Sequence, residues 1–125
     1  MNNMLKLKTW AVMGATDDKS KFGYKILKSL KEKGYDVYGI NPKYKEIENV
    51  KVVSSIDELP QVPDVVNVIV NPKIALQSLE GIKRFGVKNI WFQPGSFDEE
   101  VIKKAEELGF NIENKSCAYV ELSKI

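Results

Sequence analysis

The stretch DVVNVIV, residues 64–70, most constrains how this chain can fold. It is β-branched and apolar nearly throughout, and it does not alternate regularly between apolar and polar residues. A strand without such alternation is buried on both faces, which happens where helices cover both sides of a parallel sheet. The segment therefore predicts a layered α/β fold built around a parallel sheet.

Further strands and helices alternate around this segment. Apolar runs predict strands at residues 9–13, 36–40, 89–92 and 110–113, and a short edge strand at 51–53. Apolar stripes at helical spacing predict helices over residues 22–33, 72–85 and 97–108, with a closing helical turn at 118–122. Short connections and right-handed crossovers then predict one domain over residues 1–125. Its expected form is a doubly wound, Rossmann-like parallel sheet in three layers.

Serines predict where the helical segments begin. Ser20 is expected to cap the first helix. Ser55 with Glu58, and Ser96 with Glu99, have the spacing of capping boxes.

The loop after the first strand is the first candidate binding segment. In open α/β sheets, ligands bind beyond the carboxyl ends of the strands. A glycine there lets the backbone approach a ligand, and the free N–H groups of the following helix bind anions. The residues that predict a phosphate site are Gly14, Ala15, Thr16, Ser20 and Lys21.

The spacing in this loop excludes the common nucleotide motifs. It is neither GxxxxGK[ST] nor GxGxxG, so phosphoryl transfer of the P-loop type is not expected. After the second strand, a dinucleotide fold would place an acid on the ribose. This chain has Asn41, Pro42 and Lys43 there, with Lys45 beyond. Amines near a ribose suit a phosphorylated ribose, which indicates NADP or coenzyme A.

Composition excludes several other classes. The chain has no histidine and one cysteine, so we expect no metal site and no Ser-His or Cys-His nucleophile pair. Its net charge is +2, and lysines alternate with glutamates, so we expect no nucleic-acid partner. No apolar run reaches the length of a membrane span, so no membrane association is expected. The single thiol, Cys117, suits a reducing, cytoplasmic compartment and is expected to be a packed or loop side chain.

Several segments in order resemble a known family. GATDDKSKFGYKI is followed by VYGINPKYKEI, DVVNVIVNP and IWFQPGSFDEE, and then by Cys117 and an aliphatic-rich tail. Over residues 8–122 the chain is similar to the small single-domain CoA-binding proteins, relatives of the CoA-binding domain of the succinyl-CoA synthetase α subunit.

The resemblance implies how coenzyme A would be held. It places the pyrophosphate at Gly14, Ala15, Thr16, Ser20 and Lys21, and the 3′-phosphoribose near Asn41, Pro42 and Lys43. It places the adenosine beside Val70, Asn71 and Pro72, and the pantetheine arm toward Gln93, Pro94 and Gly95. Lys21 stands where many members carry an arginine, and lysine cannot form the bidentate contact of a guanidinium.

We therefore expect non-catalytic binding of coenzyme A or an acyl-CoA by a carrier, sensor or regulatory module. The synthetase needs a phosphorylated histidine in another domain, and this chain has none. An NAD(P)-binding redox protein or sensor is the first alternative. An interaction module that has lost its ligand is the second, and Asp17 and Asp18 in the phosphate loop are its best support. The sequence does not identify a protein partner, and it does not decide between a monomer and a homodimer.

Overall fold

The computed structural model describes residues 3–125. Its strands are β1 (Thr9–Met13), β2 (Asp36–Ile40), β3 (Glu46–Ile47), β4 (Val50–Val53), β5 (Val65–Val68), β6 (Asn89–Phe92) and β7 (Asn111–Glu113). Its α-helices are α1 (Phe22–Glu32), α2 (Pro72–Phe85), α3 (Glu99–Glu107) and α4 (Ala118–Leu122). Short 3-10 helices are η1 (Asn3–Lys6) and η2 (Ile56–Glu58). None of the helices within this part of the chain is long and apolar enough to cross a bilayer.

The strands form one sheet in the order β3-β4-β2-β1-β5-β6-β7. Every pairing is parallel except that of β3 with β4. Without β3, the parallel strands follow the Rossmann order, in which the chain runs outward from β1 in one direction and then from β5 in the other. The predicted doubly wound sheet is confirmed.

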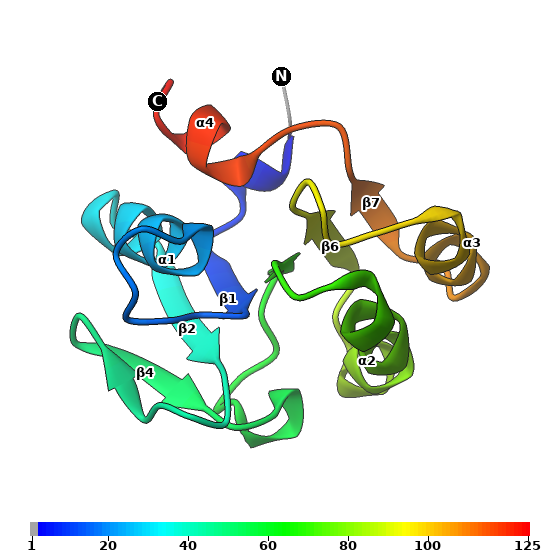
Figure 1. The fold of residues 1–125 in the computed structure, drawn as a ribbon, viewed down its shortest axis with the longest axis horizontal. Helices are drawn as coiled ribbons and strands as arrows, with labels where there is room; N and C mark the ends of the chain where they lie inside the picture. The colour runs from blue at the N-terminus through cyan, green and yellow to red at the C-terminus, as the bar shows by residue number, and fades with distance from the viewer. Residues whose placement is uncertain (1–2) are drawn as a thin grey trace.

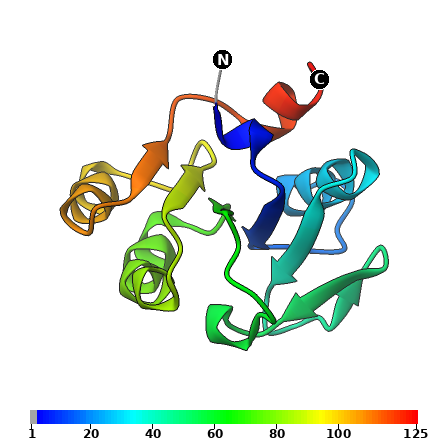
Figure 2. The same cartoon turned by 180° about the vertical axis from the view of Figure 1, so that it is seen from behind.

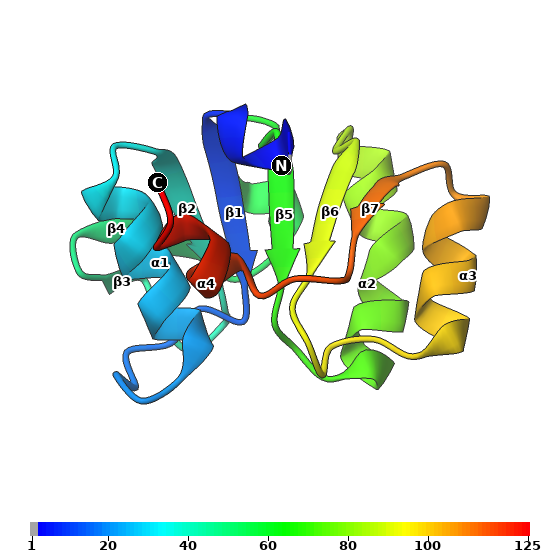
Figure 3. The ribbon, with the colours of Figure 1, turned by 90° about the horizontal axis from the view of Figure 1, so that it is seen from above.

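Helices cover both faces of the sheet. Figures 1 and 3 show α1 and α4 side by side on one face, with α2 and α3 on the other. Figure 2 shows the same arrangement from behind, with η1 and the C-terminus beside α4. Each face of the sheet has its own hydrophobic core, and successive side chains of β1 point into one core and then the other, because side chains alternate across a strand. Trp10 and Val12 join the core under α1 and α4, whereas Ala11 and Met13 join the core under α2 and α3.

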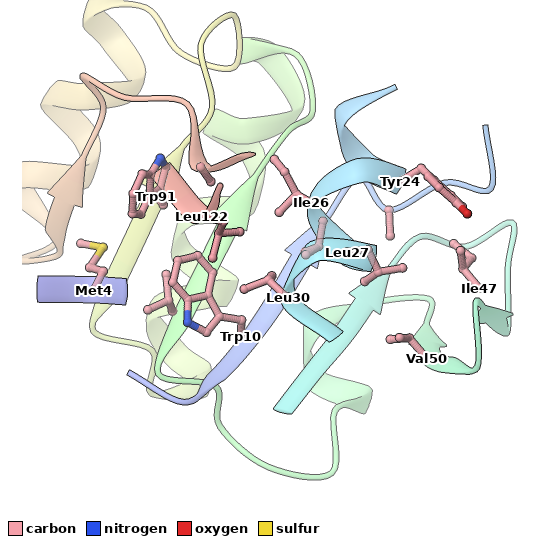
Figure 4. Packing of buried hydrophobic residues seen from close by; sticks show 14 of the residues in the cluster. Met4, Trp10, Tyr24, Ile26, Leu27, Leu30, Ile47, Val50, Trp91 and Leu122 are labelled. Carbon is pink, nitrogen blue, oxygen red and sulfur yellow. The ribbon is translucent and has the colours of Figure 1, made fainter. Parts of the chain in front are cut away.

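Two tryptophans dominate the core under α1 and α4. Trp10 and Trp91 are fully buried, with ring centroids 5.9 Å apart (Figure 4). The indole N–H of Trp10 donates to the carbonyl of Leu7, and that of Trp91 donates to the carbonyl of Ser116. Both indoles are therefore hydrogen-bonded core residues, as large aromatic residues on predicted strands suggest.

The strand boundaries correct three predictions. The predicted strand 64–70 is paired only over Val65–Val68, and the one at 110–113 begins at Asn111. The predicted edge strand 51–53 begins at Val50 and is not at the edge, because β3 pairs outside it. A two-residue turn joins β3 and β4, with Glu48 and Asn49 both at positive φ. Positive φ at both turn positions is the hairpin geometry that Asn-Gly usually marks, and Glu-Asn gave no such signal.

The observed helix caps correct two further predictions. Ser20 does not cap α1; Lys21 occupies the N-cap position without a side-chain hydrogen bond. The cap of α3 is Asp98, whose carboxylate accepts from the N–H of Val101 at 2.9 Å. Ser96 instead donates its hydroxyl to the carbonyl of Gln93. Serine and aspartate compete for the same role, and the local chain path decided between them. The capping box of Ser55 and Glu58 is confirmed.

Candidate ligand-binding site

The strand order changes direction between the parallel neighbours β1 and β5, and the residues after these strands define the site. Gly14 ends β1 with φ +106°, and its N–H donates to the carbonyl of Ile40 at 3.1 Å. A Cβ on Gly14 would lie 3.3 Å from the Cβ of Ile69 and 3.4 Å from Cγ1 of Val70. Both the positive φ and the tight neighbours require glycine here. Gly14 therefore lets the loop after β1 pass close to the end of β5, at the switch point where such folds bind ligands.

A second glycine docks the start of α1 against the end of β1. A Cβ on Gly23 would lie 2.2 Å from the carbonyl oxygen of Gly14, which no side chain can tolerate. The intervening loop must therefore fold back tightly, with the first turn of α1 beside the sheet edge. Gly23 was not among the predicted site residues, although the sequence shows a glycine on each side of the loop.

The loop is held by its own side chains and by Tyr44. The Oγ1 of Thr16 accepts from the N–H of Asp18 at 3.2 Å and lies 3.2 Å from the Tyr44 hydroxyl. That hydroxyl donates to the carboxylate of Asp17 at 3.0 Å. Because the single phenolic proton goes to Asp17, Thr16 is the donor to Tyr44. These bonds fasten the loop after β1 to the loop after β2.

Asp18 is stabilised in its charged form. Its Oδ1 accepts from the Ser20 hydroxyl at 2.7 Å and from the Ser20 N–H at 3.0 Å. These hydrogen bonds, with the nearby charge of Lys21, lower the pKa of the Asp18 carboxyl below its usual 3.8. The Ser20 hydroxyl is thus engaged with Asp18.

Asn41 joins the two loops a second time. Its Nδ2 donates to the carbonyl of Ala15 at 2.8 Å, and its Oδ1 accepts from the N–H of Lys43 at 2.9 Å. Ala15 is buried against Gly39 of β2, where a Cβ would lie only 2.9 Å away. Two of the predicted site residues, Ala15 and Asn41, therefore share one contact.

Two cavities open at this edge and share Gly14, Asn41 and Val70. The first, here called the loop cavity, has a volume of about 770 Å³. Of the predicted residues it is lined by Gly14, Thr16, Ser20, Lys21, Asn41, Lys43 and Val70. The residues of its wall that were not predicted as site residues are Asp17, Asp18, Phe22, Gly23, Tyr44 and Ile69.

The second cavity, here called the α2 cavity, has a volume of about 630 Å³. Pro42 is the predicted residue that lines it besides the three shared ones. Its apolar wall includes Ile56 and Ile74, and its far end includes Arg84, the single arginine of the chain. The residues of α2 that line this cavity were not predicted as site residues, because an apolar stripe identifies the buried face of a helix and not the face beside it.

The loop cavity is lined by charged side chains of both signs. Lys21 and Lys43 line the loop cavity, together with the carboxylates of Asp17 and Asp18. Both carboxylates accept hydrogen bonds from neighbouring residues. Within residues 3–125, neither lysine forms a salt bridge with these carboxylates, although the charge of Lys21 acts on Asp18. The cavity therefore combines two ammonium groups with hydrogen-bonded carboxylates. Such a wall can accept an anion at the lysine side.

The remaining predicted residues lie outside both linings. Asn71 caps α2 by accepting from the N–H of Ile74 at 3.0 Å, and Pro72 is the first residue of that helix. Pro94 and Gly95 are exposed in the loop after β6. Their roles toward a ligand stay predictions.

Gln93 is buried beneath the start of α4. Its Oε1 accepts from the N–H of Ala118 at 3.1 Å, and its Nε2 donates to the sulfur of Cys117 at 2.8 Å. Cys117 is half-buried at the N-cap of α4. Gln93 thus fastens α4 to the carboxyl end of β6; its place beside the pantetheine arm stays a prediction. Within residues 3–125, no three His, Cys, Asp or Glu side chains are grouped to hold a metal ion.

Known proteins are similar to this chain in fold and in sequence. The chain is 38% identical to a conserved hypothetical protein from Pyrococcus furiosus, covering 91% of this chain and 98% of that one, with a TM-score of 0.86. It is 33% identical to a hypothetical protein from Pyrococcus horikoshii, covering 97% and 85%, with a TM-score of 0.89. It is also 31% identical over 118 residues to the α subunit of ADP-forming acetate–CoA ligase II of Pyrococcus furiosus. That alignment covers 86% of this chain and 26% of the subunit, so the chain spans about a quarter of this curated relative.

A family model described as the CoA binding domain matches residues 8–123. The match spans both loops, both cavities and nearly every strand and helix described above. It confirms the resemblance drawn from the sequence segments and supports coenzyme A as the ligand. The chain belongs to the CoA binding domain family.

Proposed function

We propose that this protein binds coenzyme A or an acyl-CoA non-covalently in the cleft formed by the loop cavity and the α2 cavity. The contact of Gly23 with the carbonyl of Gly14 carries the proposal. It holds the first turn of α1 at the switch point, where Lys21, Phe22 and Gly23 line the loop cavity. A pyrophosphate fits that position because helix N-termini bind anions through free N–H groups and the helix dipole.

The pyrophosphate position follows from the hydrogen bonds of the first turn. The N–H groups of Tyr24 and Lys25 both donate to the carbonyl of Lys21. Those of Phe22 and Gly23 precede them and have no intrahelical acceptor, as in any first turn. Two N–H groups and the ammonium group of Lys21 are therefore available to the phosphate oxygens. Lys21 supplies charge but not the bidentate geometry of an arginine.

The adenosine fits the α2 cavity. Ile56, Ile74 and Val70 offer apolar surface to a purine, which binding pockets commonly supply. Lys43 lies beside Pro42 and Asn41 where the two cavities meet. A phosphate on the ribose 3′ position would lie near this ammonium group. The preference for coenzyme A over NAD would come from this contact.

The role we propose is that of a binding module, acting as a carrier, sensor or regulator. The chain has no histidine, and the Asp18 carboxylate, which accepts from the Ser20 hydroxyl, has a lowered pKa and is therefore a weak base. Binding without chemistry in the same chain is therefore the activity that this site best supports. A relative that is a subunit of a CoA ligase suggests that a protein partner can use the bound ligand.

The test is isothermal titration of the purified protein with CoA, dephospho-CoA, NADP and NAD. We expect CoA to bind, and to bind more tightly than dephospho-CoA, which lacks the 3′-phosphate. Equal affinities would remove Lys43 from the proposal but keep the ligand. Binding of NADP alone would make the protein a redox module. Heat from none of the four would overturn the proposal in favour of an interaction module without a ligand.

A further inference from the structure

Two aromatic side chains form an exposed pair between α1 and α4. Phe22 is 43% exposed and Tyr119 is 37% exposed, with ring centroids 6.1 Å apart. The ammonium group of Lys25 lies 5.4 Å from the Phe22 ring and 6.0 Å from the Tyr119 ring. The paired tryptophans of the core are, by contrast, fully buried. We call Phe22, Tyr119 and Lys25 the aromatic shelf.

The shelf lies at the carboxyl edge of the sheet. Phe22 is the first residue of α1, and Tyr119 is the second residue of α4. Both helices begin at the edge to which the strand arrowheads point in Figure 3. Phe22 also lines the loop cavity. The shelf is therefore a continuation of that cavity toward α4, on the side away from the α2 cavity.

The shelf is an organised surface. A cation over two rings holds both in place through attraction to their electron-rich faces. Gln93 holds the N-terminus of α4 through the N–H of Ala118, which fixes the residue that precedes Tyr119. Neighbouring exposed aromatic side chains form a contiguous apolar surface, and such surfaces commonly mark the binding site of a ligand or partner.

We propose that the aromatic shelf binds the pantetheine arm and acyl group of the ligand. This inference rests on the proposed function, which places the pyrophosphate in the loop cavity and the adenosine in the α2 cavity. The arm leaves the pyrophosphate on the side opposite to the nucleoside, and that side leads past Phe22 to Tyr119. The arm carries geminal methyl groups and two amides, and an acyl group adds further apolar carbon. Aromatic faces pack against such groups, and the ammonium group of Lys25 can donate to an amide or thioester oxygen.

The inference predicts that the shelf distinguishes ligands by their arm and not by their nucleotide. The experiment compares Tyr119→Ala with the unaltered protein by isothermal titration. The probes are CoA, benzoyl-CoA and adenosine 3′,5′-bisphosphate, which carries the nucleotide without the arm. We expect Tyr119→Ala to bind CoA and benzoyl-CoA about tenfold more weakly, the scale of one lost aromatic contact. Binding of the bisphosphate should be unchanged.

Two matched variants accompany it. Val120→Ala removes a neighbouring exposed side chain of α4, 47% exposed, and should leave all three affinities unchanged. Tyr119→Phe keeps the ring and should bind like the unaltered protein. Thermal unfolding should show that each variant still folds, because these side chains are partly exposed and outside the two cores.

Other results would overturn the inference. An equal loss for the bisphosphate would mean that Tyr119 acts on the loop cavity and not on the arm. If Tyr119→Ala binds every probe with unchanged affinity, the shelf does not contact the ligand, and a protein partner is the remaining occupant. If the unaltered protein binds no probe, the proposed function itself fails, and the inference fails with it. If it binds all three and Tyr119→Ala loses none, only the shelf fails.

Discussion

Gly23 packs so closely on Gly14 that a methyl group at residue 23 would lie 2.2 Å from the Gly14 carbonyl oxygen. The obstacle is backbone on both sides, so no side-chain rotation can relieve it. This contact links the end of β1 to the start of α1, and the loop that lines the cavity lies between the two glycines.

Gly23→Ala should therefore damage both stability and binding. Overpacking of a tight site costs about 1–3 kcal/mol, and a backbone obstacle places this variant at the upper end. The free energy of unfolding in urea measures the loss. CoA titration should show weaker binding in the variant, because the first turn of α1 must move away from the loop cavity.

Gly81→Ala is the matched control for stability. Gly81 lies within α2, and the nearest atom to an added Cβ is the Arg84 side chain at 3.9 Å, an ordinary contact. Alanine is favoured over glycine in a helix by about 0.5–1 kcal/mol. The control should be as stable as the unaltered protein or more so; a similar loss in both variants would contradict the role of the Gly23 contact.

Lys43→Gln should weaken CoA binding selectively. The variant removes the ammonium group proposed to face the 3′-phosphate, and the loss of one charge-assisted contact corresponds to about tenfold in affinity. Dephospho-CoA should bind the variant as it binds the unaltered protein. Lys19→Gln makes the same change of charge at an exposed loop residue outside both cavity linings, and it should have little effect on either ligand. Equal effects of the two variants would indicate a general charge effect in place of a specific contact.

Gln93→Ala should loosen α4. The variant leaves the buried N–H of Ala118 without its acceptor, which costs about 1–3 kcal/mol. Hydrogen exchange should show faster exchange at Ala118 and in the rest of α4 than in α1. Gln61→Ala removes exposed hydrogen bonds to the side chains of Asp36 and Tyr38, so it should alter stability less than Gln93→Ala does. Unchanged protection of α4 in Gln93→Ala would show that the tryptophan core alone holds this helix.

Ser20→Ala should raise the pKa of Asp18 toward its usual value. The Ser20 hydroxyl is the first cause of the lowered pKa, because it donates to the charged form of the carboxyl. A carboxyl whose pKa is lower in the folded state stabilises that state above the unfolded pKa. The contribution is lost as the pH falls through the lowered folded pKa, below 3.8. NMR titration of the Asp18 carboxyl should show this rise in the variant; an unchanged midpoint would mean that the backbone N–H of Ser20 suffices.

The sequence predicted most of the fold because its signals are local. The apolar segment around β5 predicted a strand buried on both faces, and the apolar stripe over residues 72–85 predicted the helix α2. The loops after β1 and β2 were identified as binding segments from their glycine, amide and amine residues. Seven of the predicted site residues do line one cavity together.

The errors arose where neighbouring residues compete. Serine and aspartate both cap helices, and only the path of the chain gave α3 to Asp98 and engaged Ser20 with Asp18. The β3–β4 hairpin turns through Glu48 and Asn49, whose positive φ is sustained by strand pairing and not by a typical turn sequence.

By itself, the sequence determined the parallel sheet, the order of its elements and the edge at which a ligand would bind, because periodicity and turn chemistry act between residues close in the chain. The tertiary structure alone decided which distant residues meet at that edge. The contact of Thr16 with Tyr44, the packing of Gly23 on Gly14 and the pairing of Phe22 with Tyr119 all depend on how the helices dock on the sheet. That docking is set by burial of the two cores, a property of the whole chain that no short segment contains.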